Sequence, residues 1–118
     1  MKVKCVKTSV SNPDRNIING DMREYLKVGA EFWVYGLSFK GGTAYYYIFN
    51  DNHLFQVPME MFDVIDGKVS ATWVLRNRNQ EVNLWPELFY REGFLENFAE
   101  REDAERNEFV PLRELIEC

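Results

Sequence analysis

Few side chains in this sequence are of the types that carry out catalysis or bind metals. His53 is the only histidine, and the two cysteines, Cys5 and Cys118, stand near opposite ends of the chain. General acid–base catalysis most often uses histidine, but no serine or cysteine motif adjoins His53, so we interpret it as an exposed loop residue. One histidine and two distant cysteines do not supply the ligands of an ordinary zinc site. We therefore predict no catalytic residue, no metal site and no cofactor.

Motifs for nucleotide binding and nucleophilic catalysis are also absent, since the sequence has no GxGxxG, Walker A or GxSxG pattern. The pairs Gly41-Gly42 and Asp66-Gly67 are interpreted as tight hairpin turns. We interpret Cys5 and Cys118 as free thiols, with a disulfide between them as the alternative.

Carboxylates are concentrated in the last third of the chain. Residues 1–80 hold ten Lys/Arg and eight Asp/Glu, whereas residues 81–118 hold four Arg and eleven Asp/Glu, within a net charge of −5 for the whole chain. A catalytic pair needs two acids in different environments that face a cleft, and these acids form one polar run that water keeps ionised. Two interpretations stay open: a surface that attracts a basic partner, and a solvated face that aids solubility.

A row of aromatic residues and two arginines suggest another kind of ligand. The run from Tyr45 to Phe49 offers rings on which nucleic-acid bases can stack, and Arg76 and Arg78 form a small basic patch. However, phosphate neutralisation supplies most nucleic-acid affinity, and the chain is acidic and has no larger basic cluster. We therefore expect no nucleic-acid partner and interpret the tyrosines as cross-strand pairs over a core. A small SH3-like β-barrel that binds nucleic acid is the alternative function.

Alternating apolar residues and tight turns predict that residues 1–80 form a β-rich core. The clearest strand covers residues 31–39, where alternation places Trp33, Tyr35, Leu37 and Phe39 on one face. Other strands are expected over residues 3–10, 44–49, 54–57, 62–65 and 69–76, with a brief helical turn after Pro58. This spacing is typical of a small curled antiparallel sheet or barrel.

Residues 81–118 differ from the first part and predict an acidic, partly helical tail packed on the core. Trp85-Pro86-Glu87 resembles a helix start, with proline in the first turn and an acid beside it. A length of 118 residues fits one domain, so we expect a single β-rich α+β domain over residues 1–118.

The sequence also bears on the compartment. The first ten residues, MKVKCVKTSV, lack the apolar core of a signal peptide, and no stretch approaches the roughly 18 apolar residues that a membrane span needs. We expect a cytoplasmic protein that does not contact a membrane.

Four stretches together resemble small bacterial immunity proteins, which neutralise secreted toxins, including those of contact-dependent growth inhibition. They are LKVGAEFWVYGLSF, YYYIFND, VPMEMFDVIDGKVSATW and WPELFYREGFLENFAER, and they cover roughly residues 26–101. The resemblance implies an SH3-like β core with a C-terminal helix. It also implies that the protein is not an enzyme and that its partner is a cognate toxin domain.

Many such toxins are nucleases, which are often basic because they bind phosphate, so an acidic surface can block one. Tight inhibition also needs buried aromatic or arginine anchors. The residues expected to bind the partner are Tyr90, Phe94, Glu96, Phe98, Glu100, Glu102, Asp103 and Glu105. For the aromatic members, the alternative is that they dock the tail on the β core.

Overall fold

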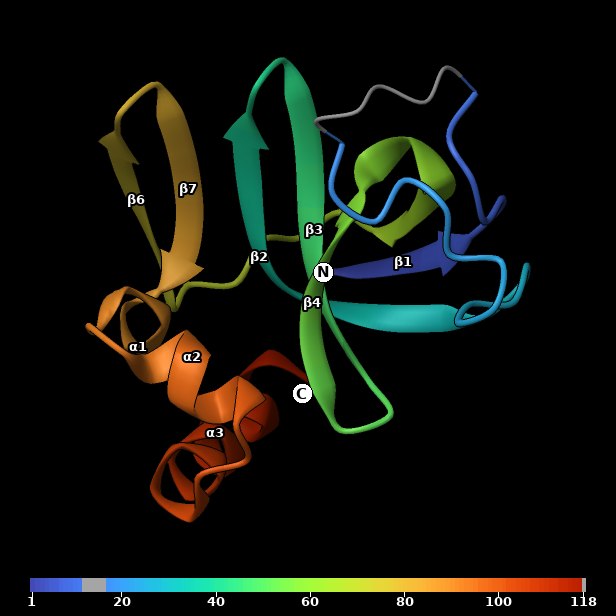
Figure 1. Cartoon of the computed structure of the whole chain (residues 1–118). Coiled ribbons are helices and arrows are strands. Elements are labelled where there is room, and N and C mark those ends of the chain that lie inside the picture. Colours follow the sequence, from blue (N-terminus) through green and yellow to red (C-terminus); the bar gives the residue numbers. More distant parts are fainter. Residues whose placement is uncertain (12–16, 118) are drawn as a thin grey trace.

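Seven antiparallel strands form one sheet in the computed structural model, which describes residues 1–11 and 17–117 (Figure 1). The strands are β1 (Lys2–Cys5), β2 (Glu31–Lys40), β3 (Thr43–Asn50), β4 (His53–Pro58), β5 (Phe62–Asp66), β6 (Trp73–Arg78) and β7 (Glu81–Pro86). Their order is β4-β3-β2-β1-β5, and β7 pairs with both β2 and β6. β2 therefore has β3 along one edge, while β1 and β7 share its other edge.

Tight turns join the long hairpins of the sheet. Gly41 and Gly42 connect β2 to β3 with φ angles of 58° and 78°. The pairs Asp51-Asn52 and Asn79-Gln80, between β3 and β4 and between β6 and β7, also have positive φ angles. Two consecutive residues with positive φ are the mark of the type I′ turn, whose twist matches that of the strands. The predicted glycine hairpin after β2 is therefore confirmed.

The hairpin predicted at Asp66-Gly67 is wrong. β5 ends at Asp66 and pairs with β1, whereas β6 begins only at Trp73 and pairs with β7. Gly67 does not have the positive φ that a type I′ turn requires. The first predicted strand is also shorter than expected, because β1 ends at Cys5, whereas the short helical turn after Pro58 is confirmed as η1 (Met59–Met61).

A bulge in β2 corrects the prediction that Trp33, Tyr35, Leu37 and Phe39 share one face. The register with β3 passes from Val34↔Ile48 to Gly36↔Tyr47, so one residue of β2 is left over. An extra residue in one strand turns all later side chains to the opposite face. Trp33 and Tyr35 consequently pack on one side of the sheet, Leu37 packs on the other, and Phe39 remains 43% exposed.

Two hydrophobic cores lie on opposite faces of this sheet. The strand core lies inside the curled sheet and consists of Val3, Cys5, Val10, Met22, Leu26, Val34, Tyr46, Ile48, Val57, Met61, Phe62 and Trp73. The helix core lies between the sheet and the C-terminal helices and consists of Tyr35, Phe89, Phe94, Phe98, Phe109, Leu112 and Ile116. The second core is mainly aromatic, which explains the high aromatic content of the chain.

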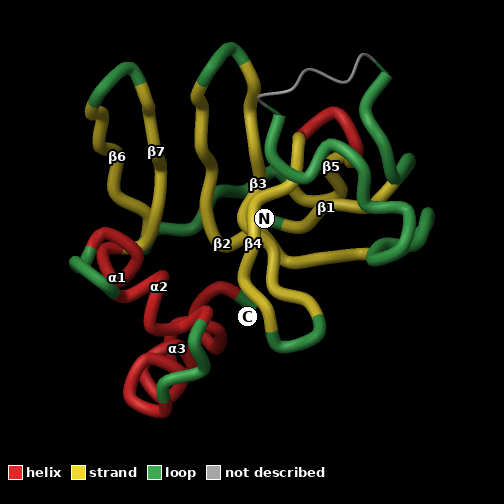
Figure 2. Tube along the Cα trace, viewed as in Figure 1, coloured by secondary structure: helices red, strands yellow, loops and turns green. Residues whose placement is uncertain are grey.

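Three helices follow the sheet and gather at one end of it (Figure 2). They are α1 (Glu87–Tyr90), α2 (Phe94–Ala99) and α3 (Asp103–Ile116), and Pro86 directly precedes α1. The predicted boundary at residue 80 falls inside the β6–β7 turn, so the first six residues of the expected tail are strand β7. The molecule is thus a small compact α+β protein with an antiparallel sheet and a C-terminal helix.

No helix among residues 1–11 and 17–117 has the length and apolar character needed to cross a membrane.

Candidate functional site

The turn between α2 and α3, together with the helix residues on either side of it, carries the acidic residues predicted to bind a partner. Arg101 takes the left-handed conformation there, with φ of 64°. Its N–H donates to the carbonyl of Phe98 at 3.1 Å, and the N–H of Glu102 donates to the carbonyl of Asn97 at 3.0 Å. These bonds satisfy carbonyls at the end of α2 and hold the reversal of the chain in one shape.

Four carboxylates, which we call the acidic corner, lie on or beside this reversal: Glu96 in the first turn of α2, Glu100 and Glu102 in the reversal, and Asp103 at the start of α3. All four side chains are exposed, and none forms an ion pair with another residue that the structure describes. Arg101 is the single basic residue within residues 96–103, which leaves a net charge of −3 on eight residues. The acidic corner is therefore a concentrated, uncompensated negative charge on an ordered backbone.

Glu105 differs from the acidic corner because it is engaged inside the molecule. A nitrogen of Arg91 lies 3.7 Å from its carboxylate, and the amide of Asn97 donates to it at 3.5 Å. Arg91 also donates two hydrogen bonds to Glu108, at 2.5 and 2.6 Å. These bonds raise the pKa of Arg91 and lower that of Glu108. Arg91 thus connects α3 to the α1–α2 segment, and the carboxylate of Glu105 takes part in that contact.

The aromatic residues predicted as partner anchors are parts of the fold. Phe94 and Phe98 are 0% and 2% exposed in the helix core. The hydroxyl of Tyr90 lies 2.7 Å from the carbonyl oxygen of Val74, and its ring stacks on Trp85 with 5.0 Å between centroids. These three rings dock the helices on the sheet, which was the alternative interpretation.

Arg106 connects the acidic corner to the β3–β4 turn. Its guanidinium donates to the carbonyl of Phe98 at 2.7 Å and to that of Asn52 at 2.5 Å. Burial of the guanidinium, and repulsion from Arg101, lower the pKa of Arg106. Arg106 consequently holds the turn at 51–52 next to the end of α2, although Arg106 and Asn52 are 54 residues apart in the sequence.

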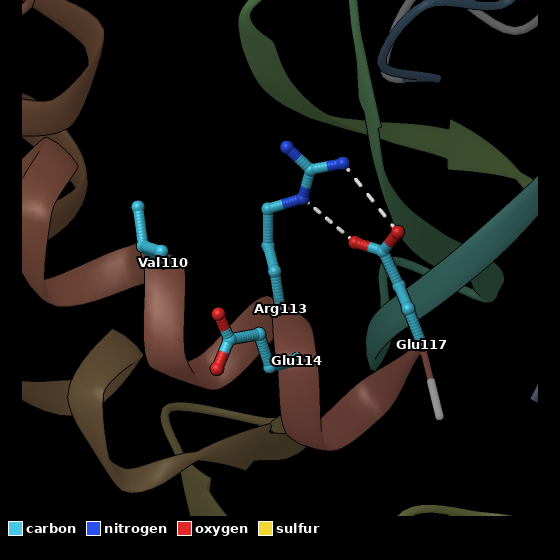
Figure 3. A pocket seen from close by; sticks show the side chains of 4 residues that line it. All are labelled: Val110, Arg113, Glu114 and Glu117. Atoms are coloured by element: carbon cyan, nitrogen blue, oxygen red, sulfur yellow. Dashed lines mark hydrogen bonds and ion pairs between the residues drawn. The ribbon is translucent and has the colours of Figure 1, made fainter.

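A shallow hollow of about 360 Å³ lies along the last turns of α3, lined by Val110, Arg113, Glu114 and Glu117 (Figure 3). Arg113 donates to Glu117 at 2.7 Å, and the hydroxyl of Tyr35 donates to the same carboxylate. Burial and the adjacent Glu117 raise the pKa of Tyr35 above its usual range. Burial opposes ionisation of Glu117, but the bonds from Arg113 and Tyr35 outweigh it and lower the pKa of this carboxyl. Arg113 and Glu117 of this hollow are thus paired with each other, and the bond from Tyr35 to Glu117 fixes the end of α3 on β2.

The other candidate chemistry is placed as follows. His53 is exposed at the start of β4, and no group of three His, Cys, Asp or Glu side chains suited to a metal ion occurs among residues 1–11 and 17–117. Cys5 is a buried free thiol whose pKa burial raises, and Cys118 lies outside the described residues. Tyr45 and Tyr46 are buried within the protein, so their rings do not form an open platform for bases.

Sequence reasoning missed three arginines that organise this region: Arg91, Arg106 and Arg113. The i, i+4 spacing of Arg113 and Glu117 on a predicted helix is a signal for that ion pair. Arg91 meets Glu108 across 17 residues, and Arg106 meets Asn52 across 54. Nothing local in the sequence indicates such long-range contacts.

Comparison of the chain with protein-family models, with characterised proteins and with solved structures gives no match in any of the three.

Proposed function

We propose that this protein binds a basic protein through the acidic corner and thereby inhibits it. From the resemblance in the sequence, we propose further that the partner is the toxin domain of a bacterial toxin–immunity pair, met in the cytoplasm, and that the curled sheet is SH3-like. The observation that carries the proposal is a set of four exposed carboxylates on or beside one braced reversal of the chain, none of which forms an ion pair with a described residue.

The arrangement of charge favours the interpretation that the acidic corner binds a partner over the interpretation that it is only a solvated surface. Other acids of the same region, Glu105, Glu108 and Glu117, form ion pairs within the fold, whereas the acidic corner forms none with the part of the chain that the structure describes. A rigid cluster of one sign steers an oppositely charged partner and accelerates the encounter. Fast association suits an inhibitor that must act before its target does damage.

The direct test is co-expression with a candidate toxin domain encoded by a neighbouring gene. We expect growth to be protected by the wild type and the purified proteins to form a complex. The Glu100→Lys/Glu102→Lys variant changes two acids that lie outside the helical residues of α2 and α3. We expect its association to be about tenfold slower at low salt, with the difference shrinking as salt screens the charges.

The matched control is Glu87→Lys/Glu114→Lys, which makes the same change of net charge on exposed residues away from the acidic corner. Thermal unfolding of both variants checks that they fold. Equal association rates for the two variants would show that overall charge, and not the acidic corner, attracts the partner. A complex that forms without growth protection would contradict the inhibitory role.

A further inference from the structure

A groove lies beside the β3–β4 turn. Its volume is about 570 Å³, within the range of sites that take small ligands or single side chains. It is lined by Asn19, Met22, Glu24, Tyr25, Asn50, Asp51, His53, Leu54 and Phe55. One wall therefore comes from the segment before β2 and the other from β3, β4 and the turn between them.

Each wall of this groove contributes a carboxylate. Glu24 and Asp51 are both exposed, and neither forms an ion pair with any residue in the described part of the chain. On the first wall the nearby arginine, Arg23, is already occupied, because it donates to Asp21 at 2.8 and 3.0 Å. The groove thus keeps two negative charges that no described cation of the protein neutralises.

Besides the polar residues Asn19, Asn50 and His53, the remaining lining is aromatic and apolar. Tyr25 is 68% exposed, so a large ring faces water beside the two carboxylates. Met22 is buried, and half-buried Phe55 packs against the same core, which gives the groove an apolar floor. Leu54, the preceding residue of β4, packs against the helix core instead. An exposed ring next to carboxylates attracts cations, while an apolar floor attracts hydrocarbon.

We propose that this groove receives an arginine side chain from the protein partner. The guanidinium would meet Glu24, Asp51 and the ring of Tyr25, and the methylene groups would lie against Phe55. Arginine fits this combination better than lysine does, because its flat guanidinium stacks on rings and presents five donors, whereas an ammonium is a strongly hydrated point charge. The inference rests on the proposed function in one respect, the basic character of the partner.

The position of the groove joins it to the acidic corner. Asp51 lines the groove, and the carbonyl of its neighbour Asn52 accepts a hydrogen bond from Arg106, which also binds Phe98 at the acidic corner. A single basic surface can therefore reach both features. The groove also supplies the exposed aromatic contact that Phe94 and Phe98, being buried, do not offer.

The test uses short peptides and the whole chain. Acetyl-Gly-Arg-Gly-amide is titrated into the labelled protein and followed by NMR, alongside peptides with lysine or with citrulline, the uncharged isostere, in place of arginine. We expect saturable shifts of the Tyr25 ring and of the Asp51 and Asn52 amides with the arginine peptide, weaker ones with lysine and none with citrulline. Equal responses to arginine and citrulline, or to arginine and lysine, would overturn the proposal.

Two conservative variants locate the site. Asp51 has a φ of 52°, a conformation that asparagine also tolerates, so Asp51→Asn removes charge without disturbing the turn. We expect Asp51→Asn and Tyr25→Ala each to weaken the arginine peptide about threefold. Glu114→Gln, an exposed acid on α3, should leave binding unchanged. Peptide binding that is insensitive to both groove variants would contradict the site.

The outcome is separable from that of the proposed function. If the arginine peptide does not bind but Glu100→Lys/Glu102→Lys still slows association with the toxin domain, the proposal of an arginine site in the groove is contradicted. The proposal that the acidic corner binds the partner is then retained. If the peptide binds and Asp51→Asn weakens its binding, while charge reversal at the acidic corner does not change association with the toxin domain, the groove proposal is supported. The proposed role of the acidic corner is then contradicted.

Discussion

The Cζ atom of Arg106 lies 3.8 Å from the centroid of the Phe98 ring. The same guanidinium donates to two carbonyls, one at the end of α2 and one in the β3–β4 turn. A single side chain of α3 therefore braces the region that carries the acidic corner and one wall of the groove. Its planar shape allows it to stack and to donate in different directions at once, which an ammonium group cannot do.

Arg106→Lys tests this brace. We expect the free energy of unfolding to fall by about 2 kcal/mol, because lysine loses the stacking on Phe98 and at least one charged hydrogen bond. Urea unfolding measures the change. The control is Arg101→Lys, an exposed arginine of the same reversal, for which we expect a change within about 0.5 kcal/mol. If Arg106→Lys is as stable as the wild type, charge alone holds the region and the stacking contributes nothing.

Gly36→Ala tests the bulge of β2. A Cβ at this position would lie 2.8 Å from Cδ1 of Trp85 and 3.3 Å from the carbonyl oxygen of Leu84, so the packing must shift. We expect a loss of about 1–3 kcal/mol in the free energy of unfolding, measured by denaturant.

Gly67→Ala is the matched control for Gly36→Ala. Its Cβ would meet only Val64, at an ordinary 3.5 Å, and Gly67 has no positive φ. Alanine there should leave stability unchanged or raise it slightly, because it restricts the unfolded chain. If the two variants have equal stability, Trp85 is free to move away from β2.

The same bulge shows why sequence periodicity predicted β2 correctly but misplaced its side chains. A bulge adds one residue without any change in the hydrophobic character of the strand, so Trp33, Tyr35, Leu37 and Phe39 still alternate along the chain. The switch of face becomes visible only when β3 supplies the partner register. Strand positions and glycine turns are local properties, whereas the assignment of a face is not.

The strand β7 was missed for a related reason. Its sequence, EVNLWP, is short and begins an acidic stretch, and its pairing with β2 depends on residues more than 40 positions away. The turn that precedes it uses Asn79 and Gln80 with positive φ, and Gln80 is not a residue that signals such a turn. Asp66-Gly67, which does carry the signal, forms no hairpin because β5 pairs with β1.

For the candidate site as well, the sequence predicted local properties of the chain but not contacts between distant residues. It identified where acidic residues are concentrated, which composition alone reveals. It did not separate the free carboxylates, such as Glu100 and Glu102, from Glu105 and Glu108, because that distinction depends on the position of Arg91. The groove was also missed, since Tyr25 and Asp51 meet only in the folded chain.

Glu117→Gln tests the attachment of α3 to β2 through its pH dependence. The pKa of Glu117 is lowered from 4.5 in the folded protein, so its contribution to stability is complete above that value. The contribution is lost as pH falls through the lower folded pKa. We expect the stability difference between wild type and Glu117→Gln to shrink below about pH 4.5, as measured by urea unfolding between pH 7 and 3.

Glu114→Gln, an exposed neighbour on the same helix, controls for the general effect of removing a carboxylate from α3. A stability difference for Glu117→Gln that stays constant across this pH range would mean that the carboxyl is not ionised in its bond with Arg113 and Tyr35.

Tyr35→Phe removes one of the two donors to Glu117 and should lower the free energy of unfolding by about 1 kcal/mol at pH 7. Tyr25→Phe, at an exposed tyrosine, should cost nothing in stability.

Pro111→Ala tests whether the proline inside α3 lowers the stability of the protein. Pro111 lies within α3 and has no N–H to donate to the carbonyl four residues earlier, that of Asn107. Its side chain is exposed, so alanine removes little packing and restores the missing hydrogen bond. We expect the free energy of unfolding to rise by about 1–3 kcal/mol, measured by thermal and urea unfolding.

Val110→Ala, at the preceding exposed position, is the control and should change stability by less than about 0.5 kcal/mol. The opposite result for Pro111→Ala would be equally informative. Phe109, Leu112 and Ile116 flank the proline and pack in the helix core. If alanine destabilised the protein, the proline would be needed to set the curvature that seats these three side chains, because proline is a common cause of bends in helices.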